Sequence, residues 1–161
     1  QLVPELADSY EMSEDGMTYT FTMKDGLKWS DGEALDANDV LYSWNRLADE
    51  NTAADYSYLC SVFATKDDGT LDIEASEDGK TFTAHLNAPC AYFLDLCAFP
   101  AFYPVPQQAV EAADGADTNP GAWALEAGFV GSGPFVLTEW KHNESMTYEP
   151  NPTTGLLTRF P

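Results

Sequence analysis

Basic residues are scarce in this sequence. Its 161 residues include seven lysines and arginines against 27 aspartates and glutamates, which gives a formal net charge of −20. Such a charge repels the phosphate backbone of nucleic acids and the headgroups of anionic lipids. The composition therefore excludes nucleic acid as a partner and predicts a highly soluble surface.

Long apolar runs are also missing, since no stretch approaches the ~18 apolar residues that a transmembrane helix needs. The first residues, QLVPELADSYE, contain neither a basic nor an apolar region, so we expect no signal peptide within this chain. Aromatic residues, by contrast, make up 13% of the sequence and extend from Tyr10 to Phe160. A chain of this length and composition is expected to fold as one domain, or as a domain with an appended segment.

Cysteine and histidine are too few, and wrongly spaced, for a metal site. Cys60, Cys90 and Cys97 allow at most one disulfide, and buried free thiols are the expected state. No CxxC or Cys/His ligand spacing occurs, and His85 and His142 are interpreted as surface residues of a strand and a turn. The sequence predicts no metal and no cofactor.

Candidate catalytic groups also have simpler interpretations. The acidic pairs 14–15, 67–68 and 77–78 each precede a glycine in a predicted turn, and none has the spacing of a calcium loop. Gly131-Ser132-Gly133 lacks the outer glycine spacing of a nucleophile elbow. Paired carboxylates could hydrolyse glycosides, but no pair lies in an evident apolar pocket that would raise a pKa. We therefore predict no catalytic residue.

The most informative stretch runs from Asp15 to Leu47. Residues 18–23 alternate between threonine and an apolar side chain, which predicts a half-buried strand. Asp36 is the expected N-cap of a following helix, and Asp39 adds negative charge to its first turn. The helix should face the core with a stripe of apolar residues: Val40, Leu41, Trp44, Leu47 and Ala48.

Further hairpins and short helices are predicted along the chain. The tetrapeptide Ser-Glu-Asp-Gly occurs at 13–16 and again at 76–79, each time before x-Thr-aromatic-Thr, and we interpret this as shared hairpin chemistry rather than gene duplication. The remaining expected elements are a strand pair around Leu71–Ile73 and Phe82–Leu86, a short helix opened by Pro89, an extended segment over 99–106, a helix over 107–113, a helix from Asn119-Pro120 through Leu125, and a hairpin of 135–140 with 146–148. The predicted fold class is α+β, with antiparallel hairpins and several short helices.

The block from Asp15 to Leu47 resembles the signature segment of bacterial extracellular solute-binding proteins of the peptide-binding family. The matching residues are Asp15-Gly16, Tyr19-Thr20-Phe21, Lys24, Gly26, Lys28-Trp29, Asp31-Gly32, Ala37, Asp39-Val40 and 43–47. Later matches are Pro104-Val105-Pro106 with Ala109-Val110-Glu111, the run Val130 to Phe135, and Asn151-Pro152. The similarity covers about 1–152, roughly the first third of a typical member.

This resemblance implies both an architecture and an activity. Residues 1–129 would be the small lobe, 130–152 a strand pair leading back to the large lobe, and 153–161 a tail that does not match the family. The whole protein would be a monomer that binds oligopeptides between its lobes and delivers them to a membrane ABC permease. It would work outside the cytoplasm, in the periplasm or anchored as a lipoprotein on the outer face of the membrane, and it would not be an enzyme.

Ligand contacts are expected from two tyrosines just beyond the signature segment. In oligopeptide-binding members a tyrosine that lines the cleft follows the motif R-L-x-D-x-N-T-A, and here residues 46–53 precede Tyr56 in the same way. Tyr58 is the second expected contact, whereas Trp29 and Trp44 are assigned to the core. The alternative function is a carbohydrate-binding module or glycan-degrading domain that uses exposed aromatics and carboxylates.

Overall fold

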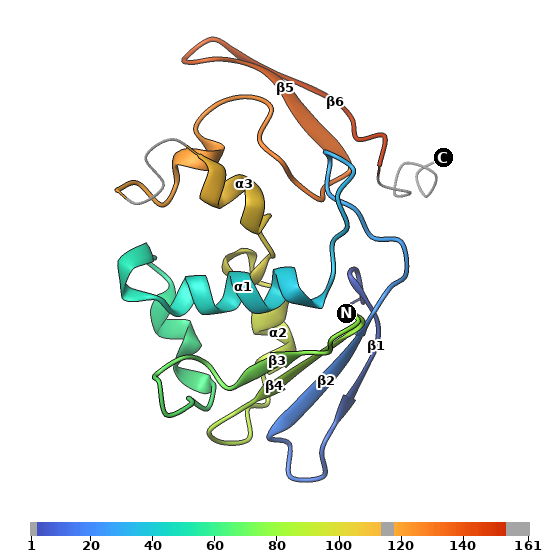
Figure 1. Cartoon of the computed structure of the whole chain (residues 1–161), viewed down its shortest axis with the longest axis vertical. Helices are drawn as coiled ribbons and strands as arrows, with labels where there is room; N and C mark the ends of the chain where they lie inside the picture. The colour runs from blue at the N-terminus through green and yellow to red at the C-terminus, as the bar shows by residue number, and fades with distance from the viewer. Residues whose placement is uncertain (1–2, 114–117, 154–161) are drawn as a thin grey trace. The chain divides into compact units, whose positions relative to one another are not determined.

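The computed structural model describes residues 3–113 and 118–153 (Figure 1). The chain forms two compact units. Unit 1 comprises the described residues up to Asp25 together with 36–105, and unit 2 comprises 26–35 with the described residues from Pro106 onward. Within the described residues, no helix is both long enough and apolar enough to cross a membrane.

Unit 1 is built on a four-stranded antiparallel sheet. Its strands are β1 (Ala7–Met12), β2 (Thr18–Met23), β3 (Ile73–Ala75) and β4 (Thr81–His85), and their order is β1-β2-β4-β3 (Figure 1). The sequence pattern predicted β2 with the bounds that the structure has. Two hairpins distant in the sequence thus join through their inner strands.

The two hairpins share one turn geometry. In the first, the Ser13 hydroxyl donates to the Asp15 carboxylate over 2.6 Å, and in the second Ser76 donates to Asp78 over the same distance. The glycine that ends each turn has a positive φ, which disfavours any side chain. A turn of fixed length determines the register of its strands, so shared turn chemistry explains why the hairpins match.

The sheet is pseudo-symmetric as well. The cross-strand pairs Tyr10–Phe21 and Met12–Tyr19 of the first hairpin correspond to Ile73–Ala84 and Ala75–Phe82 of the second. Between the hairpins, Thr20 lies opposite Thr83, its own equivalent in the repeated sequence. A pseudo-twofold axis therefore passes between these two threonines.

Helix α1 (Ala37–Ala48) begins at the predicted cap. The Asp36 carboxylate accepts from the N–H of Asn38 over 2.7 Å, and the Asp39 carboxylate accepts from the N–H of Asp36 over 3.0 Å, so the two residues form a capping box. The buried residues of α1 are Ala37, Val40, Ser43, Trp44 and Leu47. The predicted stripe is confirmed at its centre, whereas Leu41 and Ala48 are half-buried.

An aromatic core lies between α1 and the sheet. The Trp44 ring packs against Phe82 at a centroid distance of 4.8 Å and against Phe63 and Phe102 at 5.3 Å each. Its indole N–H donates to the Phe102 carbonyl over 2.9 Å, so this buried polar group is satisfied. Phe93 fills the remaining space and is fully buried.

Short helices connect the second half of unit 1. They are η1 (Glu50–Thr52), η2 (Ser57–Val62), α2 (Phe93–Cys97) and η3 (Pro100–Phe102). The helix expected from Pro89 begins only at Phe93. The expectation of a fully extended segment over 99–106 was wrong, because Pro100 begins a 3-10 turn and this turn carries Phe102 into the core.

Unit 2 contains α3 (Gln107–Ala112), η4 (Ala122–Ala124) and the hairpin of β5 (Phe135–Lys141) with β6 (Ser145–Pro150). This hairpin confirms the third predicted strand pair. The predicted helix from Asn119-Pro120 was too long. The Asn119 side chain does accept from the N–H of Gly121, over 3.2 Å, but only a 3-10 turn follows, and a glycine at that point disfavours a longer helix.

Asn151 ties the end of β6 to the rest of unit 2. Its side chain is fully buried and donates to the Gly133 carbonyl over 2.8 Å. Thr153 accompanies it and donates to the Trp29 carbonyl, also over 2.8 Å. Asn151 and the run Val130 to Phe135, both of which match the family pattern, are therefore joined by a hydrogen bond from side chain to backbone.

The three cysteines are free thiols. Cys60 and Cys90 are buried, as the sequence predicted, whereas Cys97 is half-buried. Burial raises the pKa of Cys60 to about 11 and that of Cys97 to about 12. Both are therefore protonated and unreactive at neutral pH.

We expect Gly79→Ala to destabilise the protein more than Gly16→Ala. Both glycines have φ near +70°, so each alanine costs about 1 kcal/mol from the backbone conformation. At Gly79 the added Cβ would also overlap the Asp36 carboxylate and disturb the cap of α1, which adds ~1 kcal/mol. At Gly16 the nearest atom, Cβ of Pro89, would lie 3.7 Å away. Equal losses in urea denaturation would contradict this assignment.

We also predict that the turns at 13–16 and 76–79, in which a serine donates to an aspartate, contribute to the stability of the fold in a pH-dependent way. The Ser13 hydroxyl, followed by the N–H of Met17, lowers the pKa of Asp15 below its ordinary value of 3.8. A lowered pKa stabilises the fold above pH 3.8, and this stabilisation is lost as the pH falls further. Asp15→Asn should therefore be less stable than the natural protein at pH 6, and the difference should shrink as the pH falls below 3.8.

The control for this experiment is Glu14→Gln, which removes the same charge from an exposed neighbour. Urea denaturation across the pH range measures both variants. A Glu14→Gln variant with the same pH-dependent loss as Asp15→Asn would mean that net charge, and not the turn, causes the effect.

Candidate functional site

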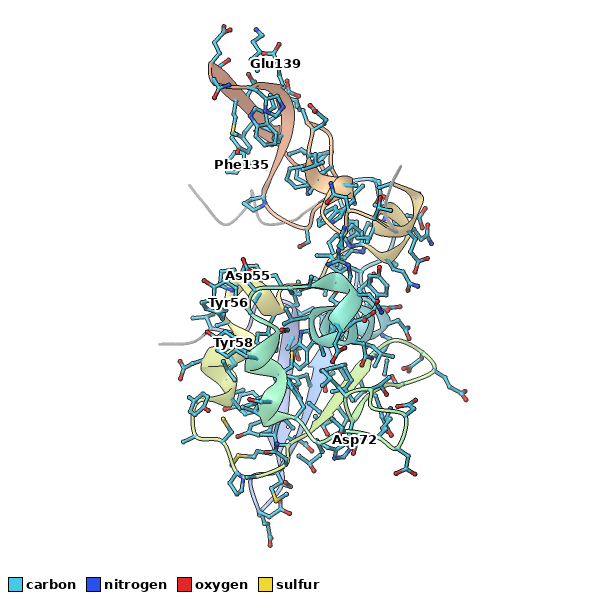
Figure 2. All side chains as sticks on the ribbon, turned by 90° about the vertical axis from the view of Figure 1, so that its left-hand side faces the viewer. Asp55, Tyr56, Tyr58, Asp72, Phe135 and Glu139 are labelled. Carbon is cyan, nitrogen blue, oxygen red and sulfur yellow. The ribbon has the colours of Figure 1, made fainter. Side chains whose placement is uncertain are left out.

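The structure places the two predicted ligand-binding tyrosines side by side. Tyr56 is the residue before η2 and Tyr58 lies inside it, with 47% and 65% of their surfaces exposed. Their ring centroids are 6.3 Å apart. Figure 2 shows both on one side of unit 1, next to Asp55. Exposed tyrosines in contact are available to a ligand, and their binding role stays a prediction.

A third ring, that of Phe99, completes what we call the aromatic cluster: Tyr56, Tyr58 and Phe99. Phe99 meets Tyr56 edge to face at 5.2 Å and is 36% exposed. Sequence reasoning missed this residue, because it lies in the proline-rich segment that was expected to be extended. The only available signal was an aromatic residue directly before a proline, which is too weak to indicate a site.

Local structure holds the cluster in place. The Asp49 carboxylate caps η1 by accepting from the N–H of Asn51 over 2.9 Å, and Ala53 then takes a left-handed conformation that turns the chain. On the underside of η2, Cys60 is buried, and Phe63 packs at its end against the aromatic core. The buried side of the segment is therefore anchored while its tyrosines remain exposed.

Two of the tryptophans are not available to a ligand. Trp29 and Trp44 are 3% and 4% exposed, which confirms their assignment to the interior. The indole N–H of Trp29 is buried without a hydrogen-bond partner among the described residues.

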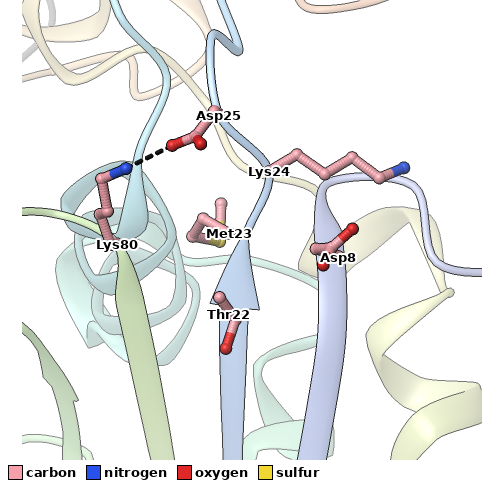
Figure 3. Close-up of a pocket in the computed structure, with 6 residues that line it drawn as sticks. All are labelled: Asp8, Thr22, Met23, Lys24, Asp25 and Lys80. Atoms are coloured by element: carbon pink, nitrogen blue, oxygen red, sulfur yellow. Dashed lines mark hydrogen bonds and ion pairs between the residues drawn. The ribbon is translucent and has the colours of Figure 1, made fainter.

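Two lysine side chains line a small hollow at one end of the sheet. It has a volume of about 300 Å³ and is lined by Asp8, Thr22, Met23, Lys24, Asp25 and Lys80 (Figure 3). Lys80 pairs with Asp25, and Lys24 donates to the backbone carbonyls of Pro4 and Glu5. Both ammonium groups are thus already bonded to oxygen atoms of the protein, so the hollow does not offer an anion site.

Acidic residues in the described ranges do not assemble a metal centre. No group of three or more His, Cys, Asp or Glu side chains there could hold an ion. The turn carboxylates of Asp15, Asp68 and Asp78 accept instead from neighbouring hydroxyl and N–H groups, which lower their pKa values.

Comparison with known proteins gives one consistent result. The family model described as "Bacterial extracellular solute-binding proteins, family 5 Middle" matches residues 1–154. The oligopeptide-binding protein OppA of Bacillus subtilis is 37% identical over 154 residues, which are 91% of this chain and 27% of that protein.

Solved structures agree with the sequence match. The substrate-binding domain of an oligopeptide ABC transporter from Bacillus anthracis superposes with a TM-score of 0.85 at 32% identity, over 97% of this chain and 30% of that one. OppA of Haemophilus influenzae, in complex with the peptide RPPGFSPFR, gives a TM-score of 0.84 at 31% identity, over 97% of this chain and 31% of that one.

These similarities extend over nearly the whole chain, while the chain spans less than a third of the length of the proteins it matches. They include both the sheet with its signature segment and the β5–β6 hairpin. The chain belongs to family 5 of the bacterial extracellular solute-binding proteins.

Proposed function

We propose that the protein to which this chain belongs captures oligopeptides outside the cytoplasmic membrane and hands them to a membrane ABC permease. The observation that carries this proposal is the family match over residues 1–154 together with the names of the relatives, which include oligopeptide-binding proteins. A relative in complex with a nine-residue peptide supports the same ligand class.

Within that protein, residues 1–129 form the small lobe and residues 130–152 form a strand pair that leads back to the large lobe. Tyr56 and Tyr58 contribute one wall of the cleft. Residues 154–161 of the proposed tail lie outside the described part of the chain. The exposed rings of Tyr56 and Tyr58, which lie just after the signature segment, support this assignment.

In the proposed mechanism the peptide is bound non-covalently and is not changed chemically. The lobes close on the peptide, whose backbone is held by hydrogen bonds while waters fill the space around its side chains, and such a site tolerates many sequences. No bond is broken, so the protein is not an enzyme. It acts as a monomer in the periplasm or anchored to the outer face of the cytoplasmic membrane.

The alternative of a carbohydrate-binding or glycan-degrading domain has no support. The relatives named above are solute-binding proteins. The burial of Trp29 and Trp44 also makes two of the four tryptophans unavailable to a sugar-stacking surface.

We expect the isolated 161-residue chain to fold but to bind peptides weakly or not at all, because the opposing wall of the cleft is missing. The full-length protein should bind them with Kd near or below about 1 μM, or −8 kcal/mol. Calorimetry with mixed tri- to pentapeptides measures both proteins. Micromolar binding by the short chain would contradict the two-walled site, and failure of the full-length protein to bind any peptide would contradict the function.

A further inference from the structure

The aromatic cluster presents ring faces and edges to whatever enters from solvent. Tyr58 is its most exposed member, Tyr56 stands between the other two, and Phe99 packs edge to face on Tyr56. The contact between Tyr56 and Phe99 restrains both rings, so little side-chain entropy remains to be lost when a ligand binds. A restrained aromatic surface favours partners that interact with a ring face.

The two chain segments that supply the rings of the cluster carry charge of one sign. These segments, 49–63 and 89–106, contain no lysine, arginine or histidine. They contain four acidic residues, Asp49, Glu50, Asp55 and Asp95, and all four are exposed. Asp55 directly precedes Tyr56 and lies on the same side of unit 1 as both tyrosines (Figure 2).

Aromatic rings on segments whose charged residues are all acidic favour a cationic ligand. The face of an aromatic ring carries negative electrostatic potential and attracts an ammonium or guanidinium group. A nearby carboxylate strengthens this attraction, and a net charge of −20 steers cations toward the protein from a distance. An acidic ligand side chain would be repelled, and an uncharged one would gain only contact area.

We propose that the cluster Tyr56, Tyr58 and Phe99, with Asp55 beside it, is a subsite for a lysine or arginine side chain of the bound peptide. This inference rests on the proposed function, since it assigns a side-chain preference within the same cleft. The rings hold the aliphatic stem and the cationic head of the side chain, and Asp55 supplies the counter-charge.

The test compares matched peptides on the full-length protein. Three tripeptides carry a single lysine among alanines, at the first, second or third position, and three more carry norleucine, which has the same carbon stem without the ammonium group. Calorimetry gives the ratio of the norleucine Kd to the lysine Kd at each position. We expect a ratio of about three to ten at one position, in line with a cation–π contact.

Variants of the cluster identify the source of that preference. Tyr58→Leu and Asp55→Asn should each bring the ratio of the norleucine Kd to the lysine Kd close to one, because each removes part of the attraction to the ammonium group. The controls are Tyr10→Leu, a tyrosine of β1 that is 47% exposed, and Asp67→Asn, an exposed acid in a turn. Both controls should leave the ratio unchanged.

Each other outcome overturns the subsite. A ratio near one at every position would mean that the cleft does not select cations. A lysine preference that survives in both cluster variants, or that both controls abolish, would place the selection elsewhere. Failure of all six peptides to bind would contradict the proposed function as well, so the norleucine series separates the loss of the subsite from the loss of peptide binding.

Discussion

The pairing of β2 with β4 is the constraint on which the rest of unit 1 depends. It joins two hairpins that are far apart in the sequence and sets Thr20 opposite Thr83 and Phe21 opposite Phe82. Because strand side chains alternate, this register collects the aromatic and aliphatic residues on one face and the threonines on the other. A shift of β2 against β4 by one residue would turn threonines toward α1. The serine-aspartate turns at 13–16 and 76–79 set the register within each hairpin.

Trp44 connects this sheet to the segments that carry the aromatic cluster, the proposed ligand-binding surface. It packs on Phe82 of β4, on Phe63 after η2 and on Phe102 of η3. The segments that carry the aromatic cluster are therefore both anchored to one buried ring. A surface held in this way is preorganised, which lowers the entropic cost of binding.

The signature segment has a structural role in this arrangement. Its aromatic residues are largely buried, its turns set register, and its acidic pair Asp36 and Asp39 caps α1. The cluster with the expected ligand contacts lies outside it, in η2 and before η3. The segment identifies the family because it builds the scaffold, while the proposed binding surface is formed by less distinctive neighbours.

Local patterns in the sequence determined much of this fold. The period-two alternation of β2, the N-cap of α1 and the β5–β6 hairpin each depend on residues close in the chain, and each was predicted correctly. The family was also recognised from short motifs, whereas the ligand-binding role of Tyr56 and Tyr58 stays a prediction. Only the tertiary structure decided the turn at Pro100, the shortness of η4 and the contact between Phe99 and Tyr56. These depend on which distant side chains compete for the same core space, and no local period encodes that competition.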